Sequence, residues 1–168
     1  MIDFKTHILP LKDGLYRLAL RITLNHQEAE DIVQETLIKL WDKRNLWDTI
    51  DSISAYAMTA CRNLALDHIK KKENQNASLD ASLIEQPDMA DSPISHAIYN
   101  DSITRIQELV NALPEKQRTC MQLRDFEGMT YKDIARILSI SEEQVKINIF
   151  RARKAVKQSF IKQEQYGI

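Results

Sequence analysis

The chain has 168 residues, of which only three are glycine and four are proline. Its formal net charge is −1, so the chain as a whole is not a basic nucleic-acid binder, and any DNA contact must come from a local patch. No apolar run reaches membrane-spanning length and no signal peptide is visible, so we expect a cytoplasmic protein without membrane insertion. Leucine, isoleucine, alanine, lysine and glutamate are plentiful, which favours an all-α fold.

Apolar side chains at helical spacing predict amphipathic helices over about residues 9–23, 26–43 and 52–72. Asn25 and Glu28 form a capping box at the start of the second of these helices. The outward side of the same helix carries Asp31, Gln34 and Glu35. On periodicity alone, that side is an ordinary solvated face.

Tryptophan and cysteine residues leave more than one interpretation open in this part of the chain. Trp41 lies on the apolar stripe of the second helix, so we expect it to be buried. Trp47 lies in a loop over residues 45–51, where it could plug the core or offer a stacking surface. Cys61 and Cys120 lie in apolar helical patterns without metal-ligand spacing, which predicts buried, reduced thiols rather than a redox or metal site.

A change in composition predicts two domains. The stretch after residue 72 is acidic, rich in Asn, Gln and Ser, and free of lysine and arginine until residue 105. We interpret residues 74–92 as an acidic linker between two small helical domains, over residues 1–73 and 93–168. Ser92 followed by Pro93 is typical of a helix start.

The second domain is expected to contain a helix-turn-helix over residues 130–160, after a helix over residues 114–126 that Gly128 ends. Capping boxes at Thr130-Asp133 and Ser141-Gln144 mark the starts of its two helices, and about three residues of turn separate the helices.

The second helix of this motif divides into two faces when its residues are placed 100° apart. The face expected to be core carries Val145, Ile149, Ala152 and Val156. The opposite side and its flank carry cations and apolar residues: Lys146, Ile147, Phe150, Arg151 and Lys154. A DNA-reading helix needs such a surface, although a solvated basic helix that caps a bundle would share the charge pattern.

Taken in order, three stretches resemble the extracytoplasmic-function (ECF, group 4) sigma factors of bacterial RNA polymerase, in the sigma-70 family. Residues 29–41, AEDIVQETLIKLW, and residues 60–72, ACRNLALDHIKKK, are similar to parts of that family's region 2. Residues 113–118, LPEKQR, with 123–135, LRDFEGMTYKDIA, and 145–154, are similar to region 4.

The resemblance implies partners and residue roles. Core RNA polymerase would be bound at two places, its beta-prime clamp helices and its beta flap. The clamp helices would face Asp31, Gln34 and Glu35. Promoter DNA would be contacted at the minus-10 element by Arg62, Asn63, Lys70 and Lys71. At the minus-35 element the contacts would be Lys146, Ile147, Phe150, Arg151 and Lys154. An anti-sigma factor is a further expected partner.

The preferred minus-35 DNA sequence cannot be inferred from the family, because Ile147 and Asn148 stand where relatives often have Ser and Arg. No cofactor, metal site or catalytic constellation is expected, since the four histidines are scattered along the chain.

Two other classes of protein would fit parts of the sequence pattern. One is a helix-turn-helix transcriptional regulator that acts without core polymerase, and the other is a purely helical interaction protein.

Overall fold

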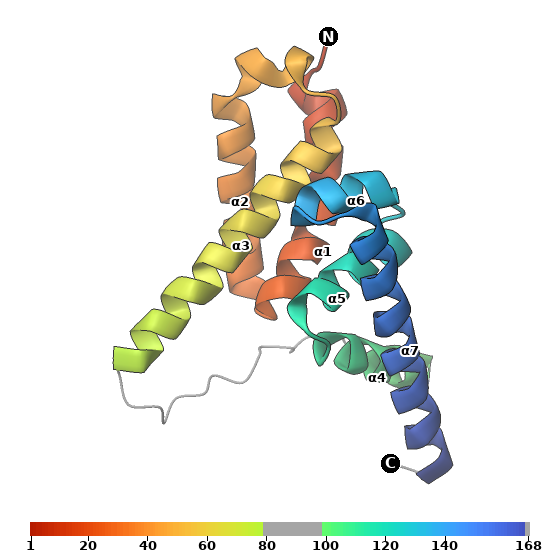
Figure 1. Cartoon of the computed structure of the whole chain (residues 1–168). Coiled ribbons are helices and arrows are strands. Elements are labelled where there is room, and N and C mark those ends of the chain that lie inside the picture. The colour runs from red at the N-terminus through yellow and green to blue at the C-terminus, as the bar shows by residue number, and fades with distance from the viewer. Residues whose placement is uncertain (79–98, 167–168) are drawn as a thin grey trace. The chain divides into compact units, whose positions relative to one another are not determined.

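The computed structural model describes residues 1–78 and 99–166, which form two compact units that are each helical (Figure 1). No strand occurs within these described ranges, so the expected all-α fold is confirmed. Most of the expected acidic linker, and the helix start expected at Ser92 and Pro93, lie outside the described residues.

The first unit contains helices α1 (Lys12–Thr23), α2 (His26–Asp42) and α3 (Ile53–Ser78). A π-helical turn over Phe4–Ile8 and a 3-10 turn over Leu9–Leu11 precede α1. Helix α1 packs against both α2 and α3, and α2 packs against α3. The fully buried side chains of this unit come from the apolar stripes predicted by periodicity, among them Leu15, Leu18, Ile22, Ile32 and Leu40.

Side-chain caps fix where α2 and α3 begin. The Asn25 side-chain oxygen accepts a hydrogen bond from the backbone N–H of Glu28 at 3.0 Å. The Ser52 hydroxyl accepts one from the backbone N–H of Ala55 at 3.2 Å. Each bond satisfies a backbone donor that the first turn of a helix leaves unpaired, so both helix starts agree with the sequence prediction.

Trp47 plugs the core of the first unit. The expected loop around it is a 3-10 turn over Arg44–Thr49. Only 4% of Trp47 is exposed, and its indole N–H donates a 2.9 Å hydrogen bond to the carbonyl oxygen of Leu40. A buried indole needs such a partner for its one donor, so the stacking-surface alternative does not apply to the described structure.

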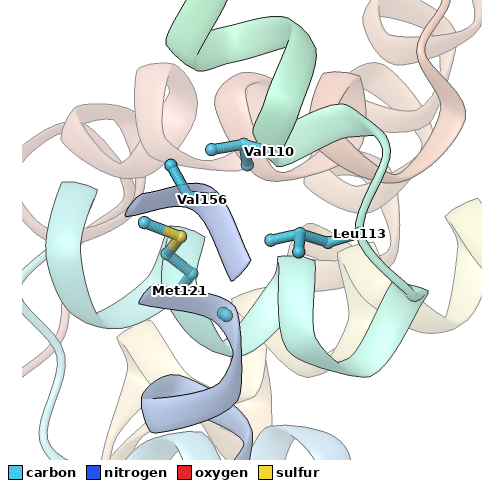
Figure 2. Close-up of a cluster of buried hydrophobic side chains, with 5 residues drawn as sticks. Val110, Leu113, Met121 and Val156 are labelled. Atoms are coloured by element: carbon cyan, nitrogen blue, oxygen red, sulfur yellow. The ribbon is translucent and has the colours of Figure 1, made fainter. Parts of the chain in front are cut away.

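The second unit contains α4 (Tyr99–Asn111), α5 (Glu115–Met121), α6 (Tyr131–Leu138) and α7 (Glu142–Tyr166). Helix α7 packs against α4 and α5. Figure 2 shows the apolar cluster at this junction, where Val110 and Leu113 meet Met121 of α5 and Val156 of α7, together with Ala152.

Three helix ends differ from the sequence prediction. Helix α3 continues to Ser78, so residues 74–78 of the expected linker are helical, and α7 continues to Tyr166 where fraying was expected. Neither extension contains a glycine or proline that would stop a helix. The single helix expected over residues 114–126 is instead α5 followed by a π-helical turn over Gln122–Phe126. Gly128, with a φ of +69°, ends this segment as predicted.

Candidate functional site

The helix-turn-helix of the second unit is held by side-chain caps at both of its helices. At α6 the Thr130 hydroxyl accepts a hydrogen bond from the backbone N–H of Asp133 at 3.1 Å. At α7 the capping box is reciprocal: the Ser141 hydroxyl accepts from the N–H of Gln144 at 3.1 Å, and the Gln144 side-chain oxygen accepts from the N–H of Ser141 at 3.2 Å. Ser139 has a φ of +55°, the left-handed conformation that reverses the chain in the turn.

The two faces of α7 lie as the sequence predicts. The residues assigned to the core, Val145, Ile149, Ala152 and Val156, are buried. The residues assigned to the outward side, Lys146, Ile147, Phe150, Arg151 and Lys154, are all exposed. Phe150 is 66% and Ile147 is 41% exposed, which is unusual for large apolar side chains on a folded helix. This surface combines cations that attract phosphates with apolar groups that can contact thymine methyls.

A groove along one flank of α7 was not expected from the sequence. Its walls include Tyr131 at the start of α6 and the cations Lys146, Arg153, Lys154 and Lys157 of α7. We call this feature the Tyr131 groove. The only sequence signal was the position of Arg153 and Lys157 one and two turns after Ile149, between the core and outward faces.

The acidic face of α2 is open to solvent in the first unit. Asp31, Gln34 and Glu35 are all exposed. The Glu35 carboxylate lies 3.6 Å from Nε2 of His68 on α3, and half of the Glu35 side chain remains exposed, 48%. Two turns earlier on α2, Glu28 pairs with Lys72 of α3 at 3.0 Å. The acidic face is therefore partly tied to α3 but still available to a basic partner.

Exposed apolar residues continue this face of α2 toward its C-terminus. Ile38 is 61% and Trp41 is 48% exposed, so the expectation that Trp41 is buried is wrong. The Trp41 ring is held at the surface, because it packs edge to face with Phe4 at 5.7 Å and with Trp47 at 6.2 Å between ring centroids. The missed signal was spacing: Gln34, Ile38 and Trp41 follow one another at helical intervals of four and three residues. We call Asp31, Gln34, Glu35, Ile38 and Trp41 the α2 surface.

On α3 the expected DNA contacts do not all reach the surface. Asn63, Lys70 and Lys71 are exposed, whereas Arg62 is only 8% exposed and interacts with other groups of the chain. A phosphate contact would require the Arg62 side chain to leave its buried position, and its assignment to the minus-10 element stays a prediction.

Asn63 lines a hollow between α2 and α3. Tyr56, Ala60 and Leu64 of α3 and Lys39 of α2 form other parts of its wall. The hollow therefore offers an aromatic ring, an amide and a cation around a partly apolar floor. These groups can stack on a base and hydrogen-bond to its edge.

Neither cysteine contributes to a surface site. Cys61 and Cys120 are both buried and free, as expected. Burial raises the pKa of the Cys61 thiol to about 12. Within residues 1–78 and 99–166, no group of histidine, cysteine or acidic residues is placed to hold a metal ion. The same described ranges contain no helix that is long and apolar enough to cross a bilayer.

Known proteins with similar sequences and structures are sigma factors. The chain is 29% identical over 154 residues to the ECF RNA polymerase sigma factor SigW of Bacillus subtilis, an alignment that covers 87% of this chain and 82% of the relative. It is 26% identical over 161 residues to the RNA polymerase sigma-H factor of Pseudomonas aeruginosa, covering 91% and 83% of the two chains. The sigma factor RpoE of Bartonella quintana, solved in complex with the anti-sigma factor NepR, superposes with a TM-score of 0.82. That match has 27% identity and covers 95% of this chain and 97% of that one.

The fold and its helix-turn-helix surface define a DNA-binding transcription protein made of two helical units. The profile of Sigma-70 region 2 matches residues 8–75, and the profile of Sigma-70, region 4, matches residues 103–156. The chain belongs to the sigma-70 family of RNA polymerase sigma factors, in its ECF group.

Proposed function

We propose that this sigma factor binds core RNA polymerase through the α2 surface and directs it to promoters through DNA contacts on α3 and α7. The observation that carries the proposal is the order of the two family matches, region 2 on the first unit and region 4 on the second. We assign residues 1–73 to region 2, residues 74–92 to a connecting segment and residues 93–168 to region 4. The chain acts as an initiation factor in the cytoplasm and performs no catalysis of its own.

The α2 surface suits the beta-prime clamp helices of the polymerase. Its acidic part, Asp31, Gln34 and Glu35, offers carboxylate and amide groups to a basic helix, while Ile38 and Trp41 offer apolar area that a partner can cover. Charge steers such an encounter and sets its salt dependence, and an exposed tryptophan is a frequent centre of binding energy. The second unit would contact the beta flap.

The hollow beside Asn63 suits a base of the minus-10 element that has left the stack. Extrusion of a base costs a few kcal/mol, so a shaped pocket is required in addition to charge. The Asn63 side chain and the exposed Tyr56 ring line the hollow. Lys70 and Lys71, exposed further along α3, would hold backbone phosphates.

The outward side of α7 suits the major groove of the minus-35 element. Arg151 can donate two hydrogen bonds to a guanine edge, and Ile147 or Phe150 can contact a thymine methyl. Lys146 and Lys154 flank these residues and would hold phosphates. Because position 147 is apolar here, the preferred minus-35 sequence differs from that of relatives with a polar residue at this position.

An anti-sigma factor is a further proposed partner. The Bartonella quintana relative was solved with such a protein, NepR. A partner of this kind would cover apolar or polymerase-binding surface of the present chain, and the α2 surface provides both.

The docking assignment is tested by replacing Gln34 and Glu35 together with alanine. Both side chains are exposed, so the fold should persist while co-purification with core polymerase and run-off transcription are lost. A matched control replaces Gln107 and Glu108, an exposed Gln-Glu pair on α4, and should keep both activities. Normal polymerase binding by the first variant would refute the docking assignment. Tight, specific duplex binding without polymerase would instead favour a conventional helix-turn-helix regulator.

A further inference from the structure

Four cations line the Tyr131 groove, and one of them pairs with an acidic residue outside the lining. Lys146, Arg153, Lys154 and Lys157 line it from α7. The carboxylate of Asp125, in the π-helical turn after α5, reaches the same Arg153. Such a surface, next to a helix that enters the major groove, lies where the adjacent backbone of the duplex would pass.

Arg153 holds the Asp125 carboxylate with two donors. Its Nε donates to Oδ2 at 3.0 Å, and its Nη2 contacts Oδ1 in a second, shorter interaction. A guanidinium binds two phosphate oxygens in the same forked geometry. The Arg153 guanidinium of the groove wall is therefore already paired with two anionic oxygens, in the geometry that a phosphate would adopt.

The aromatic wall of the groove is fixed by cations. The guanidinium carbon of Arg124 lies 4.5 Å from the centre of the Tyr131 ring, and the Lys146 ammonium nitrogen lies 5.6 Å from it. These cation–π contacts orient the ring and place Lys146 at the mouth of the groove. The Lys146 ammonium lies beside the ring and its side chain is exposed, so an incoming anion can approach it.

We propose that the Tyr131 groove binds a phosphate of the DNA backbone, and that this phosphate replaces the Asp125 carboxylate as the partner of Arg153. The inference rests on the proposed DNA binding by α7 and adds a site that reads no sequence. Asp125 acts as an internal competitor, so it weakens binding of the chain to any duplex. The exchange is feasible because the ion pair is partly open to water, with 52% of the Arg153 and 26% of the Asp125 side chain exposed.

The test measures binding of the full chain to short mixed-sequence duplexes over a series of salt concentrations. Asp125→Asn removes the competitor and should tighten binding about 2- to 5-fold on every sequence, the range expected for one partly exposed charge contact. Arg153→Gln should weaken binding on every sequence and lower the salt slope by about 0.9, the value for one lost phosphate contact. In the Arg153→Gln background, Asp125→Asn should bring little further gain.

A matched control separates the exchange from a change in overall charge. Glu164→Gln also removes one carboxylate that pairs with an arginine of the same unit, Arg105, at 3.0 Å, but this arginine does not line the groove. This variant should bind DNA as the parent chain does. An equal gain from Glu164→Gln, a gain from Asp125→Asn that persists without Arg153, or no measurable duplex binding at low salt would each overturn the proposal.

Co-purification of the same variants with core polymerase tests the proposed sigma-factor function separately from the phosphate exchange at the groove. The groove variants leave the α2 surface intact, so they should bind core polymerase normally. If the parent chain does not bind core polymerase, the proposed sigma-factor docking is refuted. The phosphate exchange at the groove would still be judged by the duplex-binding data.

Discussion

At the scale of single residues, the Cys61 thiol shows how burial changes the chemistry of a side chain. Its sulfur is fully removed from water and lies 3.4 Å from the carbonyl oxygen of Leu15. Burial raises its pKa from 9.0 to about 12, although hydrogen bonds with Thr36 and Ala19 oppose part of the increase. A thiol that stays protonated is a poor nucleophile, so Cys61 acts as a small apolar core residue.

This pKa predicts how stability depends on pH. Between about pH 9 and 12 the unfolded chain releases the Cys61 proton while the folded chain retains it. The contribution of the group to the free energy of unfolding is therefore complete below pH 9 and is lost as the pH rises toward 12. Urea unfolding at several alkaline pH values should show a steeper loss for the parent chain than for Cys61→Ala, by up to about 1.4 kcal/mol per pH unit. Parallel slopes for the two proteins would mean that the thiol ionises equally in both states.

At the scale of elements, the start of α7 is the best-defined helix end in the second unit. The bonds between Ser141 and Gln144 run in both directions, at 3.1 and 3.2 Å. They hold the first turn, which carries Lys146 and Ile147 toward the outward side. The same cap therefore supports both the stability of the helix and the placement of the proposed base contacts.

Replacing Ser141 with alanine should lower the free energy of unfolding by about 1 kcal/mol, because the backbone N–H of Gln144 loses its side-chain acceptor. Ser159→Ala is the matched control, since Ser159 is exposed in the middle of α7, where alanine is the better helix former. Thermal or urea unfolding followed by circular dichroism gives both values. An equal effect of the two changes would show that the capping bonds do not stabilise α7 in solution.

The elements that sequence patterns predict well are those with polar caps. Asn25, Ser52, Thr130 and Ser141 mark helix starts, since the capping side chain and the apolar spacing after it agree. Sequence patterns predict burial wrongly for a residue that can lie either in the core or at the surface. Trp41 lies at the edge of the apolar stripe of α2 but is held at the surface by Phe4, which is distant in sequence, and by Trp47 in the following turn. The hydrogen bonding of the π-helical turns likewise depends on packing that periodicity does not contain.

At the scale of the whole molecule, polymerase docking and minus-35 recognition are proposed for different units of the chain. The α2 surface lies on the first unit, and the outward side of α7 lies on the second. The resemblance of short motifs predicts the acidic part of the α2 surface and the outward side of α7, and the structure shows these side chains exposed. The resemblance could not predict the burial of Arg62 or the ion pair between Asp125 and Arg153, since both depend on side-chain partners within this chain.

Because the two surfaces lie on different units, their loss should be separable. Arg151→Ala should keep core polymerase binding and cost about 1–3 kcal/mol at the minus-35 element, with relaxed preference at one base pair. Gln34→Ala with Glu35→Ala should lose polymerase binding and keep the weak, salt-dependent binding to mixed duplexes. Co-purification measures polymerase binding. Duplex titration, together with transcription from a promoter library, measures DNA binding and base preference.

A variant that combines Arg151→Ala, Gln34→Ala and Glu35→Ala tests whether the two surfaces act independently. The affinity of the full chain for duplex DNA should fall by the sum of the separate effects to within about 0.5 kcal/mol, as it does for sites without shared partners. Lys162→Ala, which removes an exposed cation of α7 outside the helix-turn-helix, should leave the base preference unchanged. If Arg151→Ala weakens binding equally on every sequence, Arg151 contacts a phosphate, and the base contact then falls to Ile147 and Phe150. If it abolishes polymerase binding as well, the assignment of Arg151 to DNA rather than to polymerase is wrong.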